Sequence, residues 1–180
     1  MEHILSVLIL LFLGCSQKQS FIYVDSPVVN THKKCNCSLA VKEISLPYYL
    51  EDAKVPYIKD GKIEFFPDTY FADDSSEFAT KRAVDILKKT LTNRVYIYPW
   101  NSKDVKYILS IDIQKFITKD KVVSLTARWT LFDKDKHIIK SSIYHDSISL
   151  TKVSAQNSVD AMKILFDRFI EKTARKISGF

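Results

Sequence analysis

Residues 107–148, YILSIDIQKFITKDKVVSLTARWTLFDKDKHIIKSSIYHDSI, alternate apolar and polar side chains in three successive runs. This period of two is typical of strands that bury one face, and the charged turn at 133–136 separates the second run from the third, Ile138–Ile148. The stretch therefore predicts an antiparallel meander, with Trp129 in the core on the face of Leu125 and Leu131. The apolar positions of the first two runs are Tyr107, Leu109, Ile111, Ile113, Leu125, Ala127, Trp129 and Leu131.

Shorter strands and two helices are expected around the meander. We predict strands at 21–24, 38–44 and 95–98, and a hairpin of 54–58 with 62–66 across the turn-forming pair Asp60-Gly61. A helix begins at Ser75 or Ser76, and a second helix covers 154–177. Both helices carry apolar residues at helical spacing on one face, so the prediction is an α+β two-layer sandwich with the helices on one side of a mostly antiparallel sheet.

Composition narrows the classes of function. The 180 residues suffice for one domain, and the net charge of +6 comes from lysines scattered along the chain. Nucleic-acid binders usually cluster basic residues beside stacking aromatics or a known motif, and this chain has neither, so no nucleic-acid partner is expected. Scattered lysines indicate a solvated surface that mildly favours anionic lipid headgroups.

The amino terminus indicates secretion. An apolar run at 4–13 is too short to span a bilayer but has the length of a signal-peptide core, and Gly14-Cys15 and a polar stretch follow it. A small residue followed by cysteine at this place resembles the lipobox of bacterial lipoproteins, in which the cysteine is lipidated and becomes the first residue. We expect a cleaved signal peptide at 1–14, a lipidated Cys15 with a linker to residue 20, and one domain at 21–180.

Lipidation would hold the protein in the cell envelope, because two acyl chains bury enough methylene groups for durable attachment. Ser16 follows the cysteine, and the sorting logic of diderm bacteria then favours the periplasmic face of the outer membrane. A buried N-terminal helix with a core cysteine is the competing interpretation of this segment. The polar stretch directly after Cys15 argues against that interpretation.

Cys35 and Cys37 are two residues apart. In an oxidising compartment such a pair tends to be oxidised, and residues i and i+2 of a strand point the same way, so a disulfide is compatible with the spacing. Redox and metal roles are less well supported, since redox motifs use Cys-x-x-Cys and a zinc site needs more ligands than His32 would add. We expect a structural pair, with no metal or cofactor.

No residue pattern predicts catalysis. The sequence His145-Asp146-Ser147 has the types of a catalytic triad, but adjacent strand residues point to opposite faces. The acidic group Asp73, Asp74 and Glu77 stands where a helix begins, where carboxylates complement the helix dipole. His3 leaves with the signal peptide and His137 lies in a charged turn, so the protein is expected not to be an enzyme.

Several segments, in order, resemble the ABC-type transport auxiliary lipoproteins. They are the strand FIYV at 21–24, VKEISLPYYL at 41–50, RVYIYPW at 94–100, the strand 107–116 ending in Phe, and LTARWTLFD at 125–133. The family often has Trp before the first helix, where this chain has Tyr70-Phe71-Ala72, and it does not require the Cys35/Cys37 pair.

The resemblance implies a non-catalytic component of an envelope lipid transporter. Its partners would be a mammalian-cell-entry-domain protein bridging the membranes and an ABC permease with its ATPase, and it allows a ring of identical subunits. Two alternatives stay open: a lipoprotein that assists outer-membrane protein assembly or secretion, and a periplasmic hydrolase using Asp73 or His145. The identity of co-purifying proteins would distinguish an assembly or secretion lipoprotein from a transport component. Convergence of Asp73, Asp74 and His145 on one pocket would favour the hydrolase.

Overall fold

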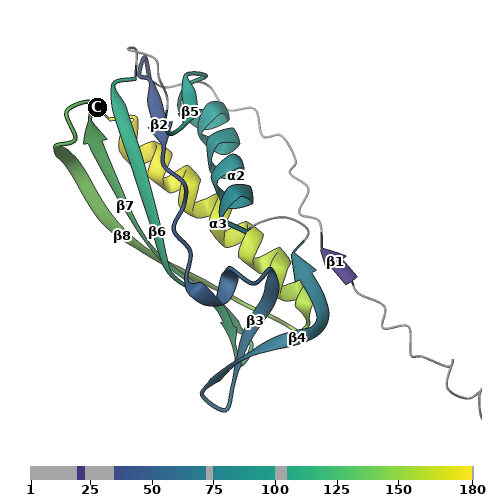
Figure 1. Ribbon diagram of the computed structural model, residues 1–180. Helices are drawn as coiled ribbons and strands as arrows, with labels where there is room; N and C mark the ends of the chain where they lie inside the picture. The colour runs from purple at the N-terminus through teal and green to yellow at the C-terminus, as the bar shows by residue number, and fades with distance from the viewer. Residues whose placement is uncertain (1–19, 23–34, 72–74, 100–104, 180) are drawn as a thin grey trace, which may run out of the picture.

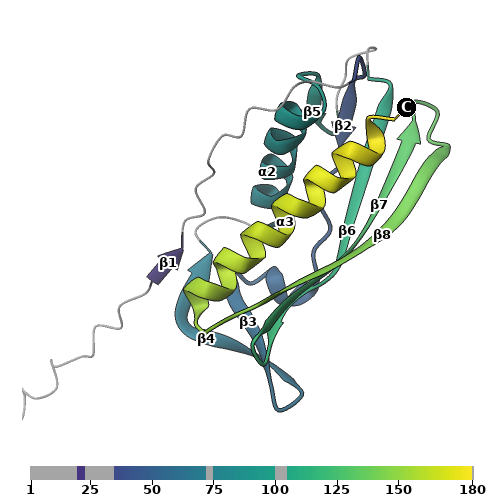
Figure 2. The same cartoon turned by 180° about the vertical axis from the view of Figure 1, so that it is seen from behind.

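The computed structural model describes residues 20–22, 35–71, 75–99 and 105–179. One eight-stranded sheet forms a layer, and two helices, α2 (Ser75–Thr90) and α3 (Ala155–Ile177), lie together on one side of it (Figures 1 and 2). The predicted α+β architecture with both helices on one face is confirmed.

The meander forms the long part of the sheet. Strands β6 (Tyr107–Lys119), β7 (Val122–Asp133) and β8 (Ile138–Ser149) pair antiparallel, and in the middle Ile111 stands opposite Trp129, which stands opposite Ser142. The side chain of Trp129 is 1% exposed, which confirms the predicted register. The alternation of the sequence therefore describes this region correctly, because one face of each strand packs under the helices.

A second segment runs along the other edge of β6, and its pairing is parallel. Strand β2 (Leu39–Val41) and strand β3 (Lys54–Lys59) pair with opposite ends of β6, and the short 3-10 helix η1 (Tyr48–Leu50) lies between them in sequence. At a bulge in β6, the amide of Phe116 donates to Tyr49 Oη at 3.0 Å. Burial raises the pKa of that tyrosine above its usual value, so the hydroxyl stays protonated.

The remaining strands extend the sheet at both ends. Strand β4 (Lys62–Phe71) forms the predicted hairpin with β3, and the turn residues Asp60 and Gly61 both have positive φ. Strand β1 (Ser20–Ile22) pairs parallel with β4, and β5 (Val95–Ile97) pairs parallel with β2. The sheet is thus mixed, although its longest ladders are antiparallel.

Several strand boundaries differ from the prediction: β4 runs to Phe71 instead of residue 66, β3 ends one residue later than predicted, and β5 ends one residue earlier. The strand expected at 38–44 pairs as a regular strand only from Leu39 to Val41, because the amide of Ile44 donates to Thr80 Oγ1 of α2 at 2.9 Å and not to a neighbouring strand. The first strand begins at Ser20 and is described only to Ile22, so the predicted residues 23–24 lie outside the described part. The last helix begins as predicted, with the Ser154 hydroxyl accepting from the amide of Asn157.

An ion pair joins the two helices. Arg82 of α2 donates from Nε to Oδ1 of Asp167 in α3 at 2.6 Å and from Nη2 to Oδ2. Arg82 is 7% exposed and Asp167 29% exposed, so the pair is largely withdrawn from water. The two parallel hydrogen bonds fix how α2 lies against α3 over the sheet.

Candidate functional site

Cys15, the predicted lipidation site, lies outside the described residues. The first described strand, β1, follows it by five residues and pairs Ser20 with Thr69 of β4. Figure 1 shows β1, the β3–β4 hairpin and η1 toward one end of the molecule, and β2, β5 and the last turn of α3 at the other. We call these the hairpin end and the distal end. Within the described ranges, neither helix is long and apolar enough to cross a bilayer.

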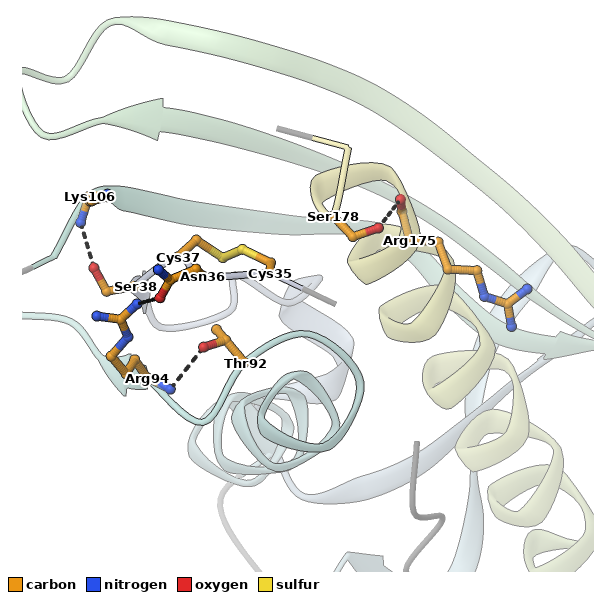
Figure 3. Close-up of a disulfide and its surroundings, with 9 residues drawn as sticks. All are labelled: Cys35, Asn36, Cys37, Ser38, Thr92, Arg94, Lys106, Arg175 and Ser178. Carbon is orange, nitrogen blue, oxygen red and sulfur yellow. Dashed lines mark hydrogen bonds between the residues drawn. A yellow bond between two sulfur atoms is a disulfide. The ribbon is translucent and has the colours of Figure 1, made fainter. Parts of the chain in front are cut away.

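Cys35 and Cys37 form a disulfide at the distal end, with their Cα atoms 5.3 Å apart (Figure 3). The bond closes a tight turn just before β2. The amide of Cys35 donates to the carbonyl of Leu91 after α2, and Asn36 Oδ1 accepts from the guanidinium of Arg94 before β5. Cys37 is buried in the hydrophobic core. The turn therefore joins the end of α2 to the starts of β2 and β5.

Metal ligands do not gather anywhere in the described part of the chain. No group of three histidine, cysteine or carboxylate side chains within those ranges is placed to hold an ion. His32, Asp73 and Asp74 lie outside the described residues.

His145 and Asp146 point to opposite faces of β8, as strand alternation predicts. His145 Nδ1 lies 3.1 Å from Thr126 Oγ1 on the face away from the helices, and its side chain is exposed. The carboxylate of Asp146 instead accepts from the Tyr144 hydroxyl at 2.7 Å and from the amide of Ser147 at 2.9 Å. The structure does not bring these residues together as a triad.

Tyr144 and Asp146 belong to an electrostatic cluster with α3. The Tyr144 hydrogen bond lowers the pKa of Asp146, and the cations Lys172 and Arg168 lower that pKa further. Burial and the same hydrogen bond raise the pKa of Tyr144. Lys172 Nζ stands 5.1 Å from the centre of the Tyr144 ring. The cluster keeps Asp146 ionised and Tyr144 protonated near neutral pH, so it stabilises contact between β8 and α3.

A row of mostly apolar residues crosses five strands at the distal end, on the sheet face opposite the helices. The pairing registers place its members side by side across β5, β2, β6, β7 and β8. Ala40 and Ile108 in the central strands are buried, Tyr96 and Phe132 are half-buried, and Ile138 at the β8 end is 66% exposed. We call this set the distal row: Tyr96, Ala40, Ile108, Phe132 and Ile138.

Lys42 and Tyr98 flank the distal row. Lys42 Nζ lies 5.3 Å from the ring centre of Phe132 and 5.8 Å from that of Tyr98, distances at which a cation is attracted to an aromatic face. Tyr98 is itself exposed. Large exposed apolar side chains beside a cation make this surface suited to contact with another protein.

Sequence reasoning missed the distal row because its residues come from distant segments. A signal was present: Ile108, Phe132 and Ile138 are apolar at positions that a polar outer face would fill with polar residues. Only the pairing register of the strands shows that these three residues lie side by side across the sheet.

Solved structures share this architecture. Protein XCC0632 from Xanthomonas campestris, described as a DUF330 protein, aligns at a TM-score of 0.72 with 12% identity, covering 89% of this chain and 96% of that protein. An uncharacterised protein aligns at 0.69 with 17% identity over 81% and 96% of the two chains. At such identities the likeness defines the class by fold alone, an α+β domain with two helices on one sheet face. Among curated protein sequences, none matches the chain.

The amino-acid sequence assigns the chain to a family. The ABC-type transport auxiliary lipoprotein component family matches residues 24–174, most of the chain, so this protein belongs to that family. Membership supports a transport-associated role, transporter partners and a place in the cell envelope, and the family is not one of known enzymes. The resemblance drawn from the sequence is thereby confirmed.

Proposed function

We propose that this protein is a non-catalytic lipoprotein of an envelope lipid transporter, held by a lipidated Cys15 at the periplasmic face of the outer membrane. The family match over residues 24–174 carries the proposal. In this role the domain docks or stabilises the periplasmic end of a mammalian-cell-entry-domain bridge, which works with an ABC permease and its ATPase. It needs no cofactor and no nucleic acid, and identical subunits can surround the bridge.

The geometry supports this role. Ser20 lies five positions after Cys15, and an extended chain over that distance reaches about 18 Å at most. A lipidated Cys15 thus keeps β1 and its partner β4 near the bilayer. Lys59 and Lys62 are exposed at the tip of the hairpin, where they suit anionic headgroups.

The distal row then lies at the opposite end of the molecule, away from the anchor. Its exposed Ile138 and the flanking Lys42 and Tyr98 form the surface that we assign to the transport partner. Tethering raises the effective concentration of this surface for a partner at the same membrane, so the interface need not be tight.

Site-specific photo-crosslinking in intact envelopes tests the proposal. A photoreactive residue in place of Ile138 samples the distal row, and the same residue in place of Asp60 samples the hairpin tip. We expect adducts from position 138 with a mammalian-cell-entry-domain protein and none with that protein from position 60. Adducts of 138 with an assembly or secretion protein would favour the other class of lipoprotein.

A further inference from the structure

Strand β8 has an open edge. Among the described strands it pairs only with β7, so alternate residues turn their backbone N–H and C=O groups outward. The amide of Ser147 donates to the carboxylate of Asp146 and is therefore not directed at β7. Residues two apart in a strand direct their backbone groups to the same side, so Ser141, Ile143 and His145 also turn their N–H and C=O groups away from β7. The stretch of β8 whose amides are open to a new strand ends before Ser147, because the amide of Ser147 is already bonded to Asp146.

Helix α3 sets a row of cations beside this strand. The chain passes from β8 into α3 through a short connection, so the two elements run antiparallel (Figure 2). Lys176 Nζ lies 3.2 Å from Ser142 Oγ, and Lys172 Nζ lies over the Tyr144 ring. Arg168 is close enough to Asp146 to lower its pKa. All three cations are exposed, and we call them the α3 cation row.

The spacing of the cation row matches that of a strand. Residues four apart on a helix rise about 6 Å along its axis. Residues two apart on a strand advance about 6.6 Å and point to the same face. A strand laid against β8 would thus place every second side chain beside one member of the row.

We propose that the open edge of β8 and the α3 cation row together bind an extended segment of a partner protein that carries acidic side chains at alternate positions. Backbone hydrogen bonds to Ser141, Ile143 and His145 supply the pairing, and Lys176, Lys172 and Arg168 select the acidic residues. This surface lies along the side of the domain and is separate from the distal row, so the proposal does not depend on the transport role.

One end of the α3 cation row specifies a further position of the partner's strand. Ile164, one helical turn before Arg168, is 45% exposed, and the same spacing sets it level with Ile148. An apolar side chain of the partner, next to its acidic residues, would cover Ile164. The recognised pattern is acidic residues at alternate positions with an apolar residue two positions beyond one end of the acidic run.

A second copy of this chain fits the edge less well. Two β8 strands paired antiparallel about a two-fold axis perpendicular to the sheet would keep both α3 helices on the same face. The two cation rows would then face each other across the joint, and like charges there oppose association. Charge complementarity therefore favours an acidic strand.

Fluorescence anisotropy with the full-length lipoprotein in detergent tests the proposal. The probe is a labelled synthetic peptide that alternates aspartate with valine, and the comparison peptide alternates lysine with valine. We expect saturable binding of the acidic peptide only, weakened by salt. Hydrogen exchange should show protection of the amides of Ser141, Ile143 and His145 on binding.

Three variants separate the parts of the site. The double charge reversal Lys172→Glu with Lys176→Glu should weaken binding about tenfold, as expected for two lost ion pairs and the repulsion that replaces them. Arg175→Glu is the matched control, since Arg175 is exposed on the same helix but pairs with Glu171, and it should change binding less than twofold. Ile143→Pro removes an outward amide at an edge position and should abolish binding while the circular dichroism spectrum stays unchanged.

The following results would overturn the proposal: no binding of the acidic peptide, equal weakening by Arg175→Glu, or retained binding after Ile143→Pro. Vesicles containing phosphatidylglycerol form the last arm. If the double reversal abolishes vesicle binding by the full chain while peptide binding is unaffected, the cation row serves the membrane and the proposal is wrong.

Discussion

Trp129 is the largest side chain that the meander buries, and its neighbour Arg128 is exposed on the opposite face of β7. We expect Trp129→Ala to lower the free energy of unfolding by about 3–5 kcal/mol, because it removes a large apolar group and leaves a cavity. Arg128→Ala should change it by no more than about 0.5 kcal/mol. Urea unfolding followed by circular dichroism measures both. Similar losses for the two variants would contradict the register.

Asp146 makes stability depend on pH. Its pKa in the folded protein is lowered, first by the Tyr144 hydrogen bond, so its ionised form favours the folded state. That contribution is complete above the unfolded-state pKa of about 3.9 and is lost as the pH falls through the lower folded-state value. Wild type should therefore lose more stability than Asp146→Asn between pH 5 and pH 3, compared by denaturant unfolding at each pH. Parallel losses would show that Asp146 is not stabilised in its ionised form.

At the scale of the elements, the ion pair between α2 and α3 is the main polar contact of the helical layer. Asp167→Ala leaves Arg82 buried without its partner, and we expect a loss of about 3 kcal/mol in the free energy of unfolding. Arg82→Met combined with Asp167→Leu should recover most of that loss, because it leaves no buried charge.

The exposed ion pair within α2 is the matched control for this prediction. Lys81 pairs with Glu77 on the helix surface, and Lys81→Met should change stability by less than about 0.5 kcal/mol. If Asp167→Ala were as mild as Lys81→Met, the interhelical pair would not hold the helices together.

The elements were largely predictable from local patterns. The period-two alternation of 107–148 indicated the meander, and the spacing of apolar residues indicated both helices. The extent of β2 was not predictable, because the amide of Ile44 bonds to Thr80 on a helix far along the chain. Local patterns report which face a residue occupies and not which distant group completes its hydrogen bonds.

At the scale of the whole molecule, the predicted lipid anchor would hold the domain at a membrane. Cys15→Ser should move the protein from the membrane fraction to the soluble fraction of lysed cells, because it removes the thiol that we predict to be acylated. The matched control is Cys37→Ser, which leaves the Gly14-Cys15 sequence intact and should stay in the membrane fraction. Unchanged fractionation of the Cys15 variant would contradict the lipoprotein prediction.

The sequence by itself determined the layers of this protein and its family, because periodicity sets the buried faces and ordered segments carry the resemblance. Only the tertiary structure showed which residues come together in the distal row and along the edge of β8. The parallel pairing of β2 with β6 aligns Ala40 with Ile108 in the distal row, and the antiparallel run of β8 and α3 sets Lys172 over Tyr144. Both arrangements depend on how segments distant in the chain pack against each other, and a local pattern, which sets only the face that each residue occupies, does not fix that packing.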